Sequence, residues 1–90
     1  MSIKDKYKEF LEVVFETVHE ECKNLPLSQM ISRIDAVNQK VDDVDRWAKK
    51  YGDGVYKIVL DFYKDNPDNP VTALFNASEY LPEAFGELPS

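Results

Sequence analysis

One stretch of the sequence carries an unbroken apolar pattern whose spacing alternates between three and four residues. No polar residue interrupts it. The eight positions are Leu27, Met30, Ile34, Val37, Val41, Val44, Ala48 and Tyr51. Because this rhythm follows the turn of an α-helix, it predicts a helix over 27–51 with an apolar seam along one side.

The residues before the seam predict another long helix. Ser2 and Asp5 form a capping-box-like start, and apolar residues then fall on one side of a helix over 3–24. Pro26 stops this helix. At about 1.5 Å of rise per residue each long helix is about 35 Å long, so a tight joint at Pro26 favours an antiparallel hairpin.

Two short helices are predicted in the rest of the chain. Segment 55–65 suits a strand as well as a helix, but a lone strand would leave its backbone groups unpaired, so we expect a helix. A last helix over 70–81 follows a turn-rich repeat of Asp-Asn-Pro, and Pro82 is expected to end it, with 82–90 as a turn or docked tail. The expected fold is a single all-α domain over 1–90, a small four-helix bundle of two long antiparallel helices, two short helices and a short C-terminal tail.

The seam leaves two packing arrangements open. In heptad terms the a positions are Leu27, Ile34, Val41 and Ala48, and the d positions are Met30, Val37, Val44 and Tyr51. A parallel two-stranded zipper prefers leucine at d, so an internal bundle helix is favoured over a homodimer through this helix. For self-association, the expected source of leftover apolar surface is a group of aromatic residues: Trp47, Tyr51, Tyr56 and Tyr63.

The composition argues against several classes of function. Eleven basic and 17 acidic residues give a net charge of -6, which disfavours nonspecific binding to nucleic-acid backbones and anionic lipids. The single cysteine, Cys22, excludes an internal disulfide and suits a reducing compartment. No window approaches the ~20 apolar residues of a membrane span. We expect a cytoplasmic protein that contacts neither membrane nor nucleic acid and that binds a protein with a basic surface.

The candidate binding surfaces are acidic. Four glutamates line the side of helix 3–24 opposite its apolar face, although like charges at these spacings cost a few tenths of a kcal/mol per pair. The C-terminal residues mix acidic with large apolar side chains, typical of segments that dock into basic-rimmed grooves. The candidate partner-binding residues are Glu9, Glu12, Val13, Glu16, Glu20, Tyr80, Glu83 and Phe85. The alternatives are a solvated glutamate face, and Tyr80 and Phe85 plugging the end of their own bundle.

An antiparallel hairpin would also gather six basic residues at one end. We name these residues the basic pole: Lys4, Lys6, Lys8, Arg46, Lys49 and Lys50. Segment 53–90 has two basic and seven acidic residues, and its folding onto the pole is the favoured outcome. If it does not fold there, the pole could hold an anion or a nucleic-acid phosphate.

Catalytic and metal-binding motifs are almost missing. Glu16 and His19 form one Glu-x-x-His, which di-metal bundles use twice, and the chain has one histidine. Cys22 falls on the apolar side of its helix near acidic residues, which disfavours a thiolate nucleophile. Three glycines, at 52, 54 and 86, cannot form a phosphate-binding loop. We expect no enzyme, no metal and no cofactor.

The sequence therefore favours a small acidic protein-binding module, acting as a stoichiometric regulator or inhibitor of a partner protein. One alternative is a self-associating structural bundle or assembly subunit. A further alternative is a nucleic-acid mimic that blocks a DNA- or RNA-binding protein, although the net charge is rather low for that role.

Overall fold

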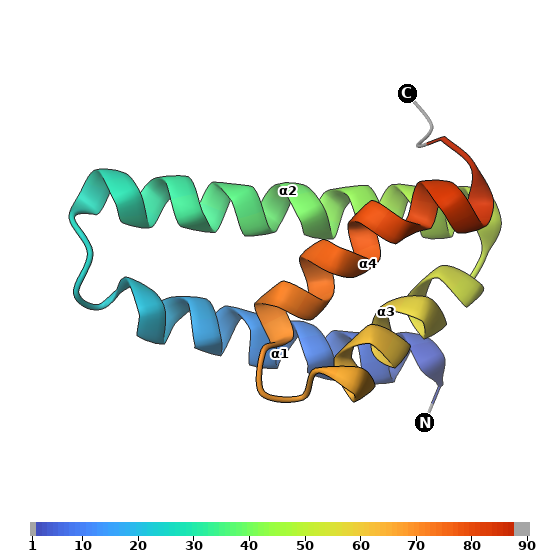
Figure 1. Cartoon of the computed structure of the whole chain (residues 1–90), viewed down its shortest axis with the longest axis horizontal. Helices are drawn as coiled ribbons and strands as arrows, with labels where there is room; N and C mark the ends of the chain where they lie inside the picture. Colours follow the sequence, from blue (N-terminus) through green and yellow to red (C-terminus); the bar gives the residue numbers. More distant parts are fainter. Residues whose placement is uncertain (1, 88–90) are drawn as a thin grey trace.

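The computed structural model describes residues 2–87, which form four helices and no strand (Figure 1). Helix α1 spans Ile3–Cys22, α2 spans Leu27–Tyr51, α3 spans Gly54–Asp65 and α4 spans Pro70–Phe85. The predicted all-α fold and four-helix bundle are confirmed.

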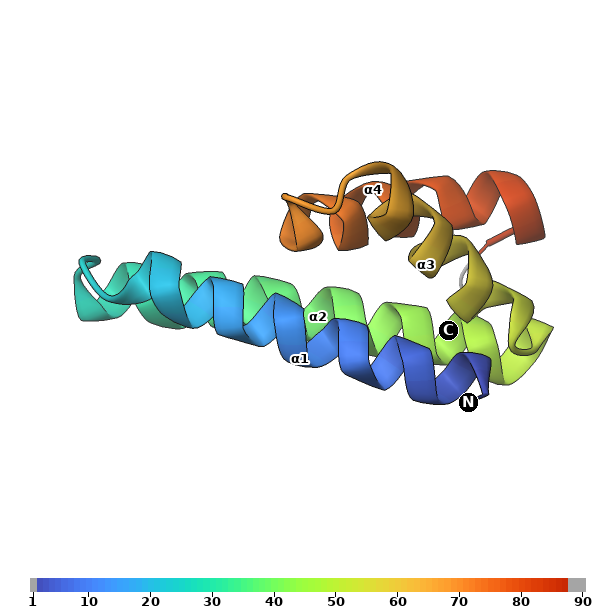
Figure 2. The same ribbon diagram turned by 90° about the horizontal axis from the view of Figure 1, so that it is seen from below.

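The helices are arranged in two layers (Figure 2). Helices α1 and α2 run antiparallel as a hairpin, and α3 and α4 lie together over one face of it. The upper layer is offset toward the open end of the hairpin, where α1 begins and α2 ends. The end with the turn projects beyond α3 and α4. We call this projecting end, residues 19–34, the hairpin tip.

The core lies between the layers and draws on every helix. Its fully buried side chains include Val14 of α1, Val37 and Val44 of α2, Val59 of α3 and Leu74 of α4. Complete burial of a Val or Leu side chain contributes about 1.5–3 kcal/mol, so these contacts between the layers are the main source of stability.

The starts of the helices follow local chemistry. The Ser2 hydroxyl accepts a hydrogen bond from the Asp5 amide at 3.1 Å, as the capping-box-like start predicts. Helix α1 ends at Cys22, two residues before the predicted end, and α3 begins at Gly54, one residue before its predicted start. Differences of this size are ordinary for helix ends.

The predicted end of the last helix is wrong. Helix α4 continues through Pro82 to Phe85, so the first four residues of the expected tail 82–90 are helical; residues 88–90 lie outside the described part of the chain. Proline lacks the amide that would bond to the Ser78 carbonyl, but its own carbonyl still accepts the Gly86 amide at 2.9 Å. One missing bond does not end a helix whose last turn is held by tertiary contacts.

Those contacts fasten the end of α4 to α2. The Phe85 ring stacks on Tyr51 with the centroids 5.3 Å apart. The Trp47 indole N–H donates to the Gly86 carbonyl at 3.3 Å, and the Tyr51 hydroxyl donates to the Glu87 carbonyl at 3.4 Å. Of the two interpretations of Phe85, the one in which it plugs the end of its own bundle matches this packing.

The predicted seam on α2 is buried along only part of its length. At the d positions Val37 and Val44 are fully buried, whereas at the a positions Leu27 and Ile34 are exposed. One reason is that α3 and α4 do not reach the tip. Another reason is that positions spaced by seven residues rotate by about 20° per repeat around a straight α-helix. The a-position side chains near the tip therefore point farther from the core than the half-buried Val41.

The aromatic surface expected to support self-association is not present. Trp47 and Tyr56 are buried, and Tyr51 and Tyr63 are half-buried. Tyr63 packs against Phe10 with the ring centroids 4.8 Å apart. These four aromatic residues pack in or against the core, and four of the five exposed large apolar side chains of the described residues are aliphatic.

Candidate protein-binding surface

Four large aliphatic side chains are exposed at or beside the hairpin tip. Leu25 and Ile34 are each 36% exposed, Ile31 is 51% exposed and Leu27 is 69% exposed. Leu25 lies in the turn, and the other three share one side of α2 because they are spaced by four and three residues. Leu25 lines a shallow recess with Ser28 and Ser32, which lie on another side of α2. We call Leu27, Ile31 and Ile34 the tip patch. Exposed apolar side chains grouped on one side of a helix commonly mark an interaction site.

The scaffold beneath the tip patch is tied to the rest of the fold. Arg33 of α2 donates to Glu21 of α1 at 3.2 Å, which links the two arms of the hairpin. The Arg33 guanidinium also lies 5.6 Å from the ring centroid of Phe75 on α4. Val18 and Cys22 of α1 are buried. The tip patch is therefore displayed on two packed helical arms.

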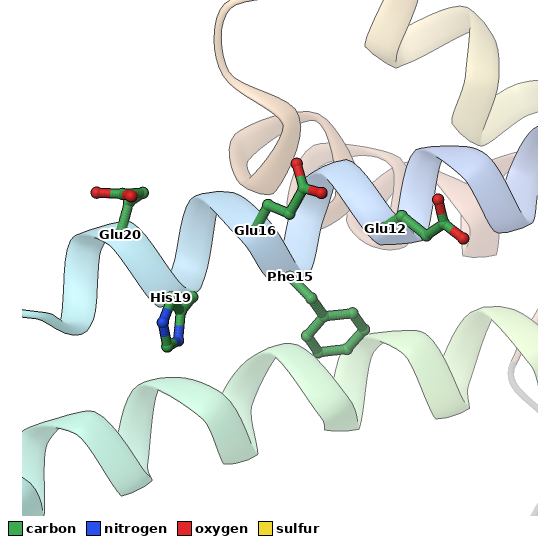
Figure 3. Close-up of a pocket in the computed structure, with 5 residues that line it drawn as sticks. All are labelled: Glu12, Phe15, Glu16, His19 and Glu20. Carbon is green, nitrogen blue, oxygen red and sulfur yellow. The ribbon is translucent and has the colours of Figure 1, made fainter.

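The predicted glutamates form an exposed row along α1. We call Glu9, Glu12, Glu16 and Glu20 the acidic stripe. In Figure 3, Glu16 and Glu20 project from the side of α1 away from α2 and Glu12 lies across the face of α1, whereas Phe15 and His19 project toward α2. These five side chains line one shallow recess on α1. Glu20 also pairs with Lys23 at 2.8 Å, in an exposed ion pair of small energetic weight.

The hairpin arms next to the tip patch are acidic, whereas the tip itself is balanced, with Glu20 and Glu21 paired to Lys23 and Arg33. Residues 9–36 contain six acidic and two basic side chains, a balance of -4. Val13, predicted beside the glutamates, is half-buried. Exposed charges act over about 8–10 Å at physiological salt, and Glu9 lies about 20 Å from the end of α1 at about 1.5 Å per residue. Most of the acidic stripe therefore acts on the part of a partner that lies along α1, beside the apolar surface. A partner that carries both apolar and basic side chains is the best electrostatic match.

The three candidate residues of the C-terminal segment do not join this surface. Tyr80, Glu83 and Phe85 lie in the second half of α4, which runs toward the end of the molecule opposite the tip (Figure 1). Tyr80 is 43% exposed, and its ring packs against Phe62 with the centroids 5.6 Å apart. The predicted binding residues thus fall into two separate regions.

The tip patch is the feature that the sequence prediction missed. A signal for it exists in the helix lengths, because α3 has 12 residues and α4 has 16, against 25 in α2. At about 1.5 Å per residue neither short helix can run the length of α2. Because α3 and α4 are both shorter than the apolar seam of α2, part of the seam stays exposed.

The described residues offer no ready metal site. Within 2–87 no group of three or more His, Cys, Asp and Glu side chains is placed to hold a metal ion. His19 is exposed on α1, and Cys22 is a buried free thiol. In the same range no helix has both the length and the apolar character needed to cross a bilayer.

Comparison of this chain with protein-family models, with curated proteins and with solved structures finds no match.

Proposed function

We propose that this protein is a small acidic helical protein-binding module that regulates or inhibits a partner by forming a stoichiometric complex through its hairpin tip. The observation that carries the proposal is the exposure of the tip patch, led by Leu27 and Ile31, beyond the reach of α3 and α4. The acidic stripe on the adjacent α1 supports a partner whose contact surface is both apolar and basic.

The two parts of the surface have different roles in this proposal. Burial of the aliphatic side chains supplies most of the affinity, since each contributes in proportion to the apolar area it loses to water. The glutamates accelerate encounter with a basic surface and make association sensitive to salt. Because the tip is already folded, binding loses little free energy to ordering.

The first test compares two double variants of α2. Leu27→Ser with Ile31→Ser removes apolar area from the tip patch, and Gln29→Ser with Asn38→Ser is the control at exposed polar positions of the same helix. A partner captured with the wild-type chain from its native host is purified and titrated against each variant by calorimetry. We expect the tip variant to bind at least about tenfold more weakly and the control to bind as wild type. Equal affinity of all three proteins would reject the tip patch as the binding surface.

The second test addresses charge. Replacing the four glutamates of the acidic stripe by glutamine should slow association and flatten its dependence on salt, with dissociation little changed. The circular dichroism spectrum should stay helical, because all four side chains are exposed. An unchanged association rate at low salt would remove the acidic stripe from the proposal.

A second copy of the chain is the alternative occupant of the tip patch. The exposure of Leu27 favours this candidate too, since two copies could bury the patch in a symmetric contact. Sedimentation over a range of protein concentrations distinguishes the two. A dimer that the Leu27→Ser and Ile31→Ser variant dissociates would establish self-association, and a monomer at all concentrations would exclude it.

A further inference from the structure

The basic pole is the charged feature that the proposed function does not use. Three of its side chains, Lys4 and Lys8 of α1 and Lys49 of α2, line one recess of about 310 Å³. The remaining lining residues are Tyr7, Leu11, Asp45 and Tyr56. The recess thus brings together α1, α2 and α3 at the open end of the hairpin, away from the tip.

The other members of the pole are engaged differently. Lys6 lines a separate recess with residues of α3. The Arg46 guanidinium lies 3.7 Å from Asp43, and the Lys50 ammonium lies 5.4 Å from the ring centroid of Tyr51.

The acidic C-terminal segment does not neutralise the recess by ion pairing. The ion pairs found within residues 2–87 join Glu20 to Lys23, Glu21 to Arg33 and Asp43 to Arg46, and none includes Lys4, Lys8 or Lys49. The sequence predicts that segment 53–90 folds onto the basic pole, and α3 does lie against it, but within the described residues none of the acidic side chains of that segment pairs with these three lysines. With Asp45 counted, the lining carries a balance of +2.

A buried hydroxyl at the recess has no partner. Tyr7 is 2% exposed, and its hydroxyl makes no hydrogen bond. Its ring stacks on Tyr56 at 4.4 Å, while the Tyr56 hydroxyl donates to Asp45 at 3.2 Å. Burial, and then the charge of Asp45, raise the pKa of Tyr7, so its hydroxyl keeps its proton and is a donor. The hydroxyl has almost no accessible surface, so it lies beneath the recess and the anion-attracting groups of the lining are its lysines.

We propose that the recess binds a phosphate group, with Lys4, Lys8 and Lys49 supplying positive charge around it. A phosphate monoester carries a charge of about -1.5 to -2 at pH 7, which matches the balance of the lining. At about 30 Å³ per water molecule the recess has room for about ten waters, enough for a phosphate and a small organic group. Asp45 keeps its negative charge while it accepts the Tyr56 hydrogen bond, so it offsets part of the attraction of the three lysines for the anion.

The test is an NMR titration of the full chain at constant ionic strength. Inorganic phosphate, glycerol phosphate and acetate are added in separate arms, and backbone amide shifts are followed. We expect saturable shifts with both phosphates, confined to residues 4–11, 45–49 and 56, and much weaker binding of acetate. Tighter binding of glycerol phosphate would indicate an organic phosphate as the ligand, and tighter binding of inorganic phosphate would indicate the free ion. Shifts that do not saturate, or acetate binding as tightly as phosphate, would overturn the proposal.

Two lysine variants show whether the response belongs to the recess. Lys8→Gln should weaken phosphate binding at least about fivefold, since it removes one of three cations around the anion. Lys23→Gln, at an exposed position at the tip, should bind phosphate as wild type. Equal weakening by both variants would mean that phosphate responds only to net charge, and the site would be rejected.

Discussion

Leu27 and Leu74 are the same residue type in opposite surroundings. Leu74 is fully buried between the layers, and Leu27 is the most exposed of the large apolar side chains described. We expect Leu74→Ala to lower the free energy of unfolding by about 2–5 kcal/mol, through lost burial and a residual cavity. Leu27→Ala should change it by less than about 0.5 kcal/mol. Urea denaturation of the two variants measures both values, and a comparable loss in each would mean that the tip is covered.

The buried tyrosines make stability depend on pH in the alkaline range. Burial, followed by the charge of Asp45, raises the pKa of both Tyr7 and Tyr56 above the ordinary value near 10. Above that pH the unfolded chain releases these protons before the folded chain does, so the folded state binds more protons and loses stability as the pH rises. Their contribution is fully present below about pH 10 and is lost above it.

This dependence can be measured with one substitution. Tyr7→Phe removes one of the two groups, so its free energy of unfolding should fall less steeply than that of wild type between about pH 10 and 12. Denaturation at several alkaline pH values gives the slope. A slope identical to that of wild type would contradict the burial of the Tyr7 hydroxyl.

At the scale of the elements, most of the helices could be predicted because their signals are local. The seam defines α2 from Leu27 to Tyr51, and Ser2 marks the start of α1. The end of α4 could not be predicted from Pro82. Its last turn is held by the stacking of Phe85 on Tyr51 of α2, and these two residues are far apart in the sequence. The candidate binding surface also has one part that could be predicted and one that could not. Helical periodicity predicts the exposed glutamates, whereas the exposure of the tip patch depends on where α3 and α4 pack on the hairpin.

The end of α4 offers a test of that contact. Gly86 has φ 104° and ψ -172°, a conformation essentially restricted to glycine, and a Cβ there would lie 3.3 Å from the Tyr51 hydroxyl. Gly86→Ala should lower the free energy of unfolding by about 1–3 kcal/mol. It should also shift the emission of Trp47, the single tryptophan, to longer wavelength as its N–H loses the Gly86 carbonyl.

A matched control separates strain from the lost contact. Gly52 has φ 94°, but a Cβ there meets no atom within 4 Å. Gly52→Ala should therefore carry the backbone strain alone and leave the emission of Trp47 nearer to that of wild type. If Gly86→Ala alters neither stability nor emission, the docking of the end of α4 on α2 is contradicted.

At the scale of the whole molecule, the two ends of the hairpin differ in cover and in charge. The open end is covered by α3 and α4 and carries the lysine-lined recess. The tip has exposed aliphatic side chains, and the acidic stripe runs along α1 beside it. This division places the proposed protein contact and the proposed phosphate site at opposite ends, so variants at one end should leave binding at the other unchanged.

The central claim is that α3 and α4 stabilise only part of the long hairpin. Amide hydrogen exchange along α2, at a concentration where sedimentation shows a monomer, tests it within a single helix. The account predicts that amides from Val37 to Ala48 exchange only with global unfolding, while those from Met30 to Ile34 exchange through local opening at markedly lower free energy. Equal protection from Met30 to Ala48 would show that the tip is as well supported as the core, and would contradict the account.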